Sequence, residues 1–346
     1  MQHRPRPLVP SRVPPFSRLL KSRDVEDPVN VWLHRPLAYG FVWATWRLPL
    51  TPNMVTFLAM SLGLASGALI LDGSPAALVA AGLLLWASAI LDGADGLLAR
   101  AKGLSSQFGR ALDGAADGVV AAATVFPALW HLWATTGDPL YLAAAGPIVW
   151  LAVQHMILYD FYKESYLRET RLERGGEGED AAAVEARAAT LDPATTSWLQ
   201  RFTLRHVLLP YVRQGERLVR WTNPEAARSA AGVGPKRARS EHTAAVYRRF
   251  NKGPMQLWAM ISLAPHSYLM ALCLMFDRVD LYFWFRLVGA NALLLVALVW
   301  QRIATLETRL ALSPEAAAPR EPERLSPAPR WLPGAERAPK TAHASR

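Results

Sequence analysis

The dominant pattern along the chain is a series of long apolar runs separated by short polar joints. A helix needs about 20 mostly apolar residues to cross the hydrocarbon core of a bilayer, and these runs approach or reach that length. The predicted fold class is therefore all-α, an integral membrane bundle of six transmembrane helices. The runs lie at residues 54–71, 75–91, 115–134, 140–162, 255–276 and 281–300.

The segments outside these runs differ in composition. Residues 1–28 are basic and proline-rich, and we predict that they are disordered. Residues 29–50 are aromatic, but Pro36 and Pro49 leave too short an interval to cross a bilayer, which favours an amphipathic helix lying at the interface. The remaining predicted units are residues 51–163 with the first four spans, 164–253 as a long cytoplasmic insert, 254–301 with the last two spans, and 302–346 as a mostly disordered tail.

The insert between the fourth and fifth spans mixes aromatic and basic residues. Trp198 and Phe202 stand among Arg201, Arg205 and further arginines. This composition is typical of one or two basic amphipathic helices resting on anionic lipid, here interrupted at Pro210. Periodicity alone equally allows a small soluble cap that packs on itself.

Basic residues are distributed unevenly between the two sets of joints. The joints DGSP, TTGDP and DRVD contain one basic residue, Arg278, out of 38 Lys and Arg in the chain. The positive-inside rule then predicts a multi-pass protein of the cell membrane with both termini in the cytoplasm. The net charge of +10 is explained by this topology and by contact with membrane lipids, so no nucleic-acid partner is expected.

Four aspartates interrupt the apolar pattern in LDGADGLLARAKGLSSQFGRALDGAADG, residues 91–118. Asp92 and Asp95 are three positions apart, and Asp113 and Asp117 are four apart, so each pair occupies one face of a helix. If the second span continues past residue 91 and the third begins near Gly109, the two pairs meet across a helical hairpin. Both pairs would lie at the cytoplasmic end of their helices.

Clustered carboxylates at a membrane boundary are costly unless a cation accompanies them. Four oxygen donors, no nearby His and a single Cys273 far along the chain suit Mg²⁺ or Mn²⁺ rather than zinc or copper. Four carboxylates could bridge two such ions. For any one aspartate, a hydrated interhelical loop is an equal alternative, but this does not explain the complete pattern.

The same residues resemble a known signature. Residues 92–117 fill every fixed position of DxxDGxxAR, eight residues, then GxxxDxxxD, which is the signature of the CDP-alcohol phosphatidyltransferases. The resemblance extends to an interfacial N-terminal helix, the triplet Thr51, Pro52 and Asn53 before the first span, and six spans. The long insert and the C-terminal tail depart from the compact members of the family.

The resemblance implies a transferase of phospholipid biosynthesis that moves a substituted phosphate group from a CDP-linked donor to an alcohol and releases CMP. It implies that Asp92, Asp95 and Asp113 are metal ligands, and that Asp117 is a ligand or the base that accepts the hydroxyl proton. The residues expected to border the substrate are Gly96, Ala99, Arg100, Gly109, Thr51, Pro52 and Asn53. Weaker candidates for binding the acceptor are Lys102, Arg110, Asn251 and Lys252.

Several alternatives stay open at this level. The expected donor is CDP-diacylglycerol, with a polar alcohol acceptor such as a phosphorylated polyol, but a CDP-linked headgroup and a diacylglycerol acceptor would use the same carboxylates. A divalent-cation transporter would instead need acidic residues near the bilayer midplane. Gly63 and Gly67 form a GxxxG pair, which is compatible with helix packing or with a homodimer. Arg286, near the outer end of the sixth run, is expected to extend outward.

Overall fold

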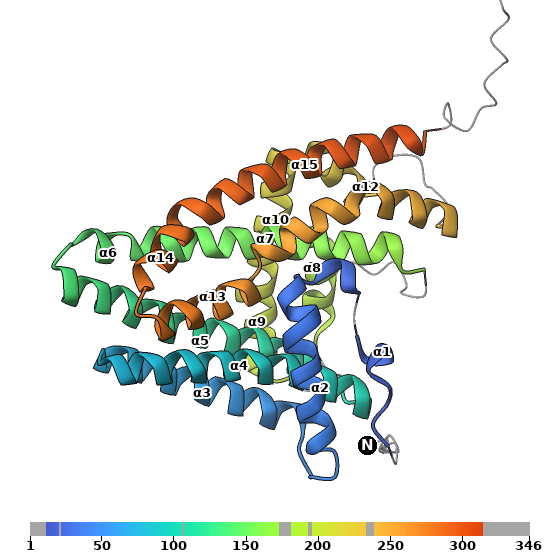
Figure 1. Ribbon diagram of the computed structural model, residues 1–346. Helices are drawn as coiled ribbons and strands as arrows, with labels where there is room; N and C mark the ends of the chain where they lie inside the picture. Colours follow the sequence, from blue (N-terminus) through green and yellow to red (C-terminus); the bar gives the residue numbers. More distant parts are fainter. Residues whose placement is uncertain are drawn as a thin grey trace, which may run out of the picture.

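The computed structural model describes residues 12–20, 22–105, 107–172, 181–192, 196–232 and 239–313, and all regular structure in them is helical (Figure 1). Six segments are long and apolar enough to cross a membrane. The all-α class and the number of spans are therefore confirmed, and the chain is a multi-pass membrane protein. The spans are α3 (Pro52–Asp72), α4 (Pro75–Lys102), most of α5 (Gln107–Thr136), α6 and α7 (Leu140–Ala143, Ala145–Thr170), α12 and α13 (Glu241–Met260, Leu263–Met275), and α14 and α15 (Val279–Trp284, Ala290–Ala311).

The ends of α3 and α4 are set by local capping signals. Thr51 is the N-cap of α3 and accepts a hydrogen bond from the Met54 N–H, and Pro52 occupies the first turn. Gly73, at a φ of 70°, closes α3, and Gly103, at a φ of 63°, closes α4. Glycine adopts this left-handed conformation without steric cost, so both helices end where the sequence supplies one.

Helix α3 packs closely against both α4 and α5. A side chain at Gly67 would overlap the backbone oxygen of Ala123, and one at Gly63 would clash with Val120. The GxxxG pair therefore serves packing between α3 and α5 within the chain, because only glycine lets these backbones come so near. This contact removes the basis on which the pair suggested a homodimer.

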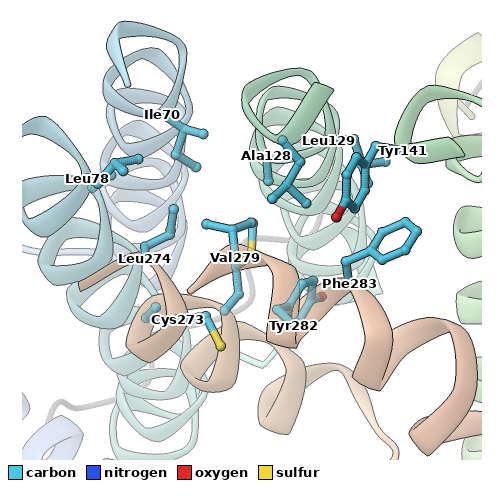
Figure 2. Packing of buried hydrophobic residues seen from close by; sticks show 14 of the residues in the cluster. Ile70, Leu78, Ala128, Leu129, Tyr141, Cys273, Leu274, Val279, Tyr282 and Phe283 are labelled. Atoms are coloured by element: carbon cyan, nitrogen blue, oxygen red, sulfur yellow. The ribbon is translucent and has the colours of Figure 1, made fainter. Parts of the chain in front are cut away.

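The apolar core of the described residues has three large parts. Figure 2 shows the first, where side chains from α3, α4, α5, α13 and α14 meet, including Ile70, Leu78, Leu129, Leu274 and Phe283. The second lies among α7, α12 and α15 and contains the fully buried Trp258. The third joins residues 38–42 to α3 and α4.

Two helical runs lie across the spans rather than along them (Figure 1). The first consists of the π turn η2 (Asn30–His34) and α2 (Arg35–Ala44), and α2 packs on α4. The second consists of α9 (Trp198–Thr203), the π turn η3 (Leu204–Leu208) and α10 (Leu209–Thr222), and α10 packs on α7. The expected interruption at Pro210 is absent, because the preceding π turn absorbs the missing N–H. The same arrangement precedes Pro36.

Three further segments differ from the sequence-based expectation. Residues 12–20 and 22–28, expected to be disordered, contain α1 (Phe16–Leu19) and the 3₁₀ turn η1 (Arg23–Val25), and they bury Leu19, Asp24 and Val25. Helix α15 continues ten residues past the expected boundary at 301, to Ala311. The remaining parts of the two predicted tails, 1–11 and 314–346, lie outside the described residues.

The insert and Arg286 also differ from the sequence-based expectation. Helix α8 (Ala181–Thr190) shares a small core with the run from α9 to α10. Helix α10 also packs on α7, and α11 (Pro224–Ala230) packs on α15. The insert therefore packs on the bundle through α10 and α11 and is not a cap that packs only on itself. Arg286 is 4% exposed and its guanidinium contacts the His266 ring, so the expectation that it extends outward is wrong. A buried acceptor on α13 keeps it inside the bundle.

Candidate active site

The four signature aspartates come from two helices that face one another. Helix α4 runs past residue 91 to Lys102 and carries Asp92 and Asp95 one turn apart; α5 carries Asp113 and Asp117. Oxygen atoms of Asp92, Asp95 and Asp113 all lie within 4.8 Å of one another. Asp117 belongs to the same cluster, since its carboxylate interacts electrostatically with those of Asp92 and Asp113. The hairpin brings the two pairs together.

The carboxylates meet between two helices whose backbones stay apart. Helix α3 packs against both α4 and α5, whereas the backbones of α4 and α5 approach one another much less. Oxygen donors at such mutual distances suit a hard divalent cation, since Mg²⁺ and Mn²⁺ bind carboxylates at short range and compensate their mutual repulsion. The residues present therefore fit the metal that the signature implies.

Two residues that sequence reasoning missed hold this cluster in place. The hydroxyl of Thr56, on α3, donates a hydrogen bond to the buried carboxylate of Asp95. Arg35, on α2, donates from Nη1 to the backbone oxygen of Gly93 at 3.1 Å, between the two α4 aspartates. Each contact ties a different helix to the signature segment.

Arg35 is the cation that acts most directly on the α4 carboxylates. Its guanidinium is paired with Glu26, at 2.9 Å from Nε and 3.1 Å from Nη2, and it acts electrostatically on Asp92 and Asp95. Burial alone would lower the pKa of Arg35, but Glu26 raises it overall, so the charge persists. An arginine beside a proline in an aromatic segment is the only sequence signal for this residue, and it resembles an ordinary interface arginine.

The expected substrate-binding residues lie along the same end of α4 and α3. A side chain at Gly96 would come within 3.3 Å of Arg100 Nη1, so the glycine leaves space for this guanidinium. Arg100 Nε donates to the Leu19 backbone oxygen at 2.7 Å. Ala99 is partly exposed beside it, and Gly109 is partly exposed near the start of α5. Thr51, Pro52 and Asn53 form the first turn of α3, as their capping pattern predicts.

The expected acceptor-binding residues are engaged elsewhere. Lys102 is buried, donates to the Leu50 backbone oxygen at 2.8 Å and lies 5.6 Å from the Trp46 ring centroid. Asn251 is buried among α12 and α15, where it donates to Thr308 at 2.8 Å. Lys252 lies 3.6 Å from Asp24. The side chain of Arg110 lies outside the described residues.

A carboxylate of α7 acts on Asp117 and is itself paired with a lysine. Asp160, on α7, acts electrostatically on Asp117 and is paired with Lys163. The Tyr211 hydroxyl of α10 donates to the other Asp160 oxygen at 2.7 Å. The insert therefore reaches the edge of the site through Tyr211, a connection that no local sequence pattern indicates.

The model of the CDP-alcohol phosphatidyltransferase family matches residues 49–184. These residues form a CDP-alcohol phosphatidyltransferase domain. The protein is accordingly an enzyme of phospholipid biosynthesis, a transferase of phosphate-containing groups that uses CDP-alcohol substrates and an alcohol acceptor in the membrane. No curated protein matches the chain by sequence.

Several residues that contact the site lie outside the CDP-alcohol phosphatidyltransferase domain. The matched residues include α3, α4, α5 and α7, which carry the aspartates, Thr56 and Lys163. Glu26, Arg35 and Leu19 precede the match, and Tyr211 follows it. Segments outside the domain therefore complete the surroundings of its carboxylates.

Proposed function

We propose that the domain transfers a phosphatidyl group from CDP-diacylglycerol to a polar alcohol and releases CMP. Two Mg²⁺ or Mn²⁺ ions would be held by Asp92, Asp95, Asp113 and Asp117. The observation that carries this proposal is the convergence of three carboxylates within 4.8 Å of one another. Divalent ions bound there would supply positive charge to the pyrophosphate oxygens of the donor.

The chemistry of the chain itself centres on Asp117. This carboxylate accepts the proton of the acceptor hydroxyl while the hydroxyl oxygen bonds to the lipid-bearing phosphorus. The bond from that phosphorus to the bridging oxygen breaks, and CMP leaves with the electron pair. Thr56 orients the Asp95 carboxylate, and Arg35 fixes the backbone at Gly93. Gly96, Ala99 and Arg100 border the CDP moiety.

The distribution of basic residues supports the proposed orientation in the membrane and the proposed class of acceptor. The basic segments predict that the carboxylates face the cytoplasm, where soluble CMP leaves. A phosphorylated polyol is the proposed acceptor, because most of the chain's basic residues lie in the segments predicted to face the cytoplasm. Lys163 replaces Lys102, Asn251 and Lys252 as the proposed contact for its phosphate, since Lys163 pairs with Asp160, which acts electrostatically on Asp117.

Purified protein in nanodiscs, with labelled CDP-diacylglycerol and Mg²⁺ or Mn²⁺, tests the proposal. CMP release is expected with a phosphorylated polyol such as glycerol 3-phosphate or inositol phosphate, and Asp113→Asn and Asp117→Asn should abolish it. Asp72→Asn, in an exposed joint far along α3, is the control and should retain activity. Unchanged turnover in both site variants would overturn the proposal. CMP release only from a CDP-linked headgroup with diacylglycerol would establish the opposite direction of transfer.

A further inference from the structure

The continuous helical run α9–η3–α10, residues 198–222, carries large apolar side chains that no other part of the described chain covers. Four large apolar residues on it are strongly exposed: Trp198 at 70%, Phe202 at 50%, Val207 at 55% and Trp221 at 83%. The opposite side is anchored, since Gly215 packs on Ile157 of α7 and Glu216 accepts from the Ala181 N–H. The exposed residues are therefore held outward by a fixed inner face.

Three of these exposed residues form an apolar stripe at the start of the run. Trp198 and Phe202 are one turn apart. Val207 follows Phe202 by five residues, which is the hydrogen-bond spacing of a π turn, so the π turn at 204–208 keeps Val207 near the same side. Trp221 lies apart at the far end of the run, because Gln214, which donates to Gln154 of α7, and Arg217 stand between it and Val207.

Two arginines flank this stripe: Arg205 is exposed and Arg201 is partly exposed. Among the described residues no carboxylate lies within ion-pair distance of Arg201 or Arg205, whereas the nearby Arg213 is paired with Glu185 at 2.7 Å. An apolar stripe beside unpaired arginines complements an anionic lipid surface, because headgroup phosphates meet the cations while the rings enter the acyl boundary.

A pocket opens at the start of this run. It has a volume of about 270 Å³ and is lined by Ala188, Leu191, Arg201, Phe202, Arg205 and His206. The rings of Phe202 and His206 lie 4.8 Å apart between their centroids. Two guanidinium groups with fixed forks can hold a phosphate bidentately, and the apolar residues of α8 suit the glycerol portion of a lipid.

From these contacts we propose that Arg201, Arg205 and His206 bind the phosphate of an anionic phospholipid, with residues 198–207 lying in the headgroup layer. The orientation agrees with this, since the run lies across the spans as α2 does (Figure 1). The site is separate from the carboxylates and is joined to them through Tyr211 and Asp160. A bound lipid would thus fix the insert against the edge of the active site.

The depth of the stripe can be measured directly. The chain has one cysteine, Cys273, which is buried, so a nitroxide can be placed on Phe202→Cys with little background. In nanodiscs containing phosphatidylglycerol, oxygen should relax this label at headgroup or acyl depth. A label on Arg228→Cys, an exposed position of α11, is the control and should be accessible to an aqueous relaxant. A fully aqueous label at 202 would overturn the proposal.

The pocket needs its own test. Native mass spectrometry should show retained phosphatidylglycerol in preference to phosphatidylcholine, with roughly tenfold weaker retention in Arg201→Ala/Arg205→Ala. Arg201→Lys/Arg205→Lys keeps the charge and should recover only part of the lipid retention. Arg213→Ala/Glu185→Ala removes the neighbouring ion pair and should retain lipid normally.

Equal retention by the alanine variant, or displacement of the lipid by millimolar glycerol 3-phosphate, would overturn the assignment to a lipid. Because both measurements record binding rather than turnover, they remain decisive whichever transfer reaction the carboxylates perform.

Discussion

Two polar clusters inside the bundle contrast sharply. Between α12 and α15, Asn251 donates to Thr308 at 2.8 Å, Gln301 donates to Asn251 at 2.8 Å, and Trp258 donates to Gln301 at 3.2 Å. Donors and acceptors are matched there, and none of the groups carries a charge. Between α4 and α5, by contrast, the three carboxylates of Asp92, Asp95 and Asp113 converge and Asp117 interacts with them, so all the groups offer acceptors of one sign.

The difference teaches how to separate a structural cluster from a functional one. A matched amide network stabilises the fold, because each buried polar group regains the hydrogen bonds it loses from water. Like charges held close together oppose folding unless a ligand compensates them. Replacing a residue should therefore affect stability in the first cluster and turnover in the second.

The largest effect is expected for Asp92→Asn. Turnover should fall roughly 10³-fold because a ligand of the ions is lost. The thermal midpoint of the purified protein should hold or rise, since one of four repelling charges is removed. A fall in midpoint as large as that of an Asn251 variant would erase the contrast between the clusters.

The close approach of α3 and α5 positions the carboxylates of α5, and Gly67→Ala tests it. The added side chain overlaps the Ala123 backbone, and we expect a loss of about 3 kcal/mol in stability. The comparison variant is Gly146→Ala, which has open space around it and should change stability by less than about 0.5 kcal/mol. Equal midpoints for the two proteins in a thermal unfolding assay would show that this packing is not tight.

Asn251→Ala probes the amide network. It leaves groups of Gln301 and Thr308 without their partner, so stability should fall by about 2 kcal/mol. Turnover per folded molecule should be unchanged. Gln256→Ala, exposed on the same helix, provides the reference. If Asn251→Ala reduced turnover while leaving stability intact, Asn251 would belong to the active site after all.

The smallest effect is expected for Thr56→Val, which preserves shape and removes the donor to Asp95. Turnover should fall about tenfold, the equivalent of about 1.4 kcal/mol, and the metal concentration for half-maximal activity should rise. Thr56→Ser should restore most of the turnover and most of the original metal dependence. Thr124→Val removes a buried hydroxyl that bonds only within α5 and should leave metal dependence unaltered.

Features encoded within a few neighbouring residues were determined by the sequence alone. Hydropathy predicts the six spans, Thr51 and Pro52 predict the start of α3, and the spacing of the four aspartates predicts that the pairs share helix faces. These signals need no knowledge of neighbouring helices, because chain length, capping and helical periodicity are local properties.

Only the tertiary structure decided which polar groups meet. Arg35 and Thr56 reach the signature from other helices, while Lys102 and Asn251 turn to partners away from it. The order in residues 12–28 likewise depends on distant contacts, such as that between Asp24 and Tyr166 at 2.9 Å. The rotation and crossing of packed helices fix these pairings, and both arise from contacts between residues far apart in the chain.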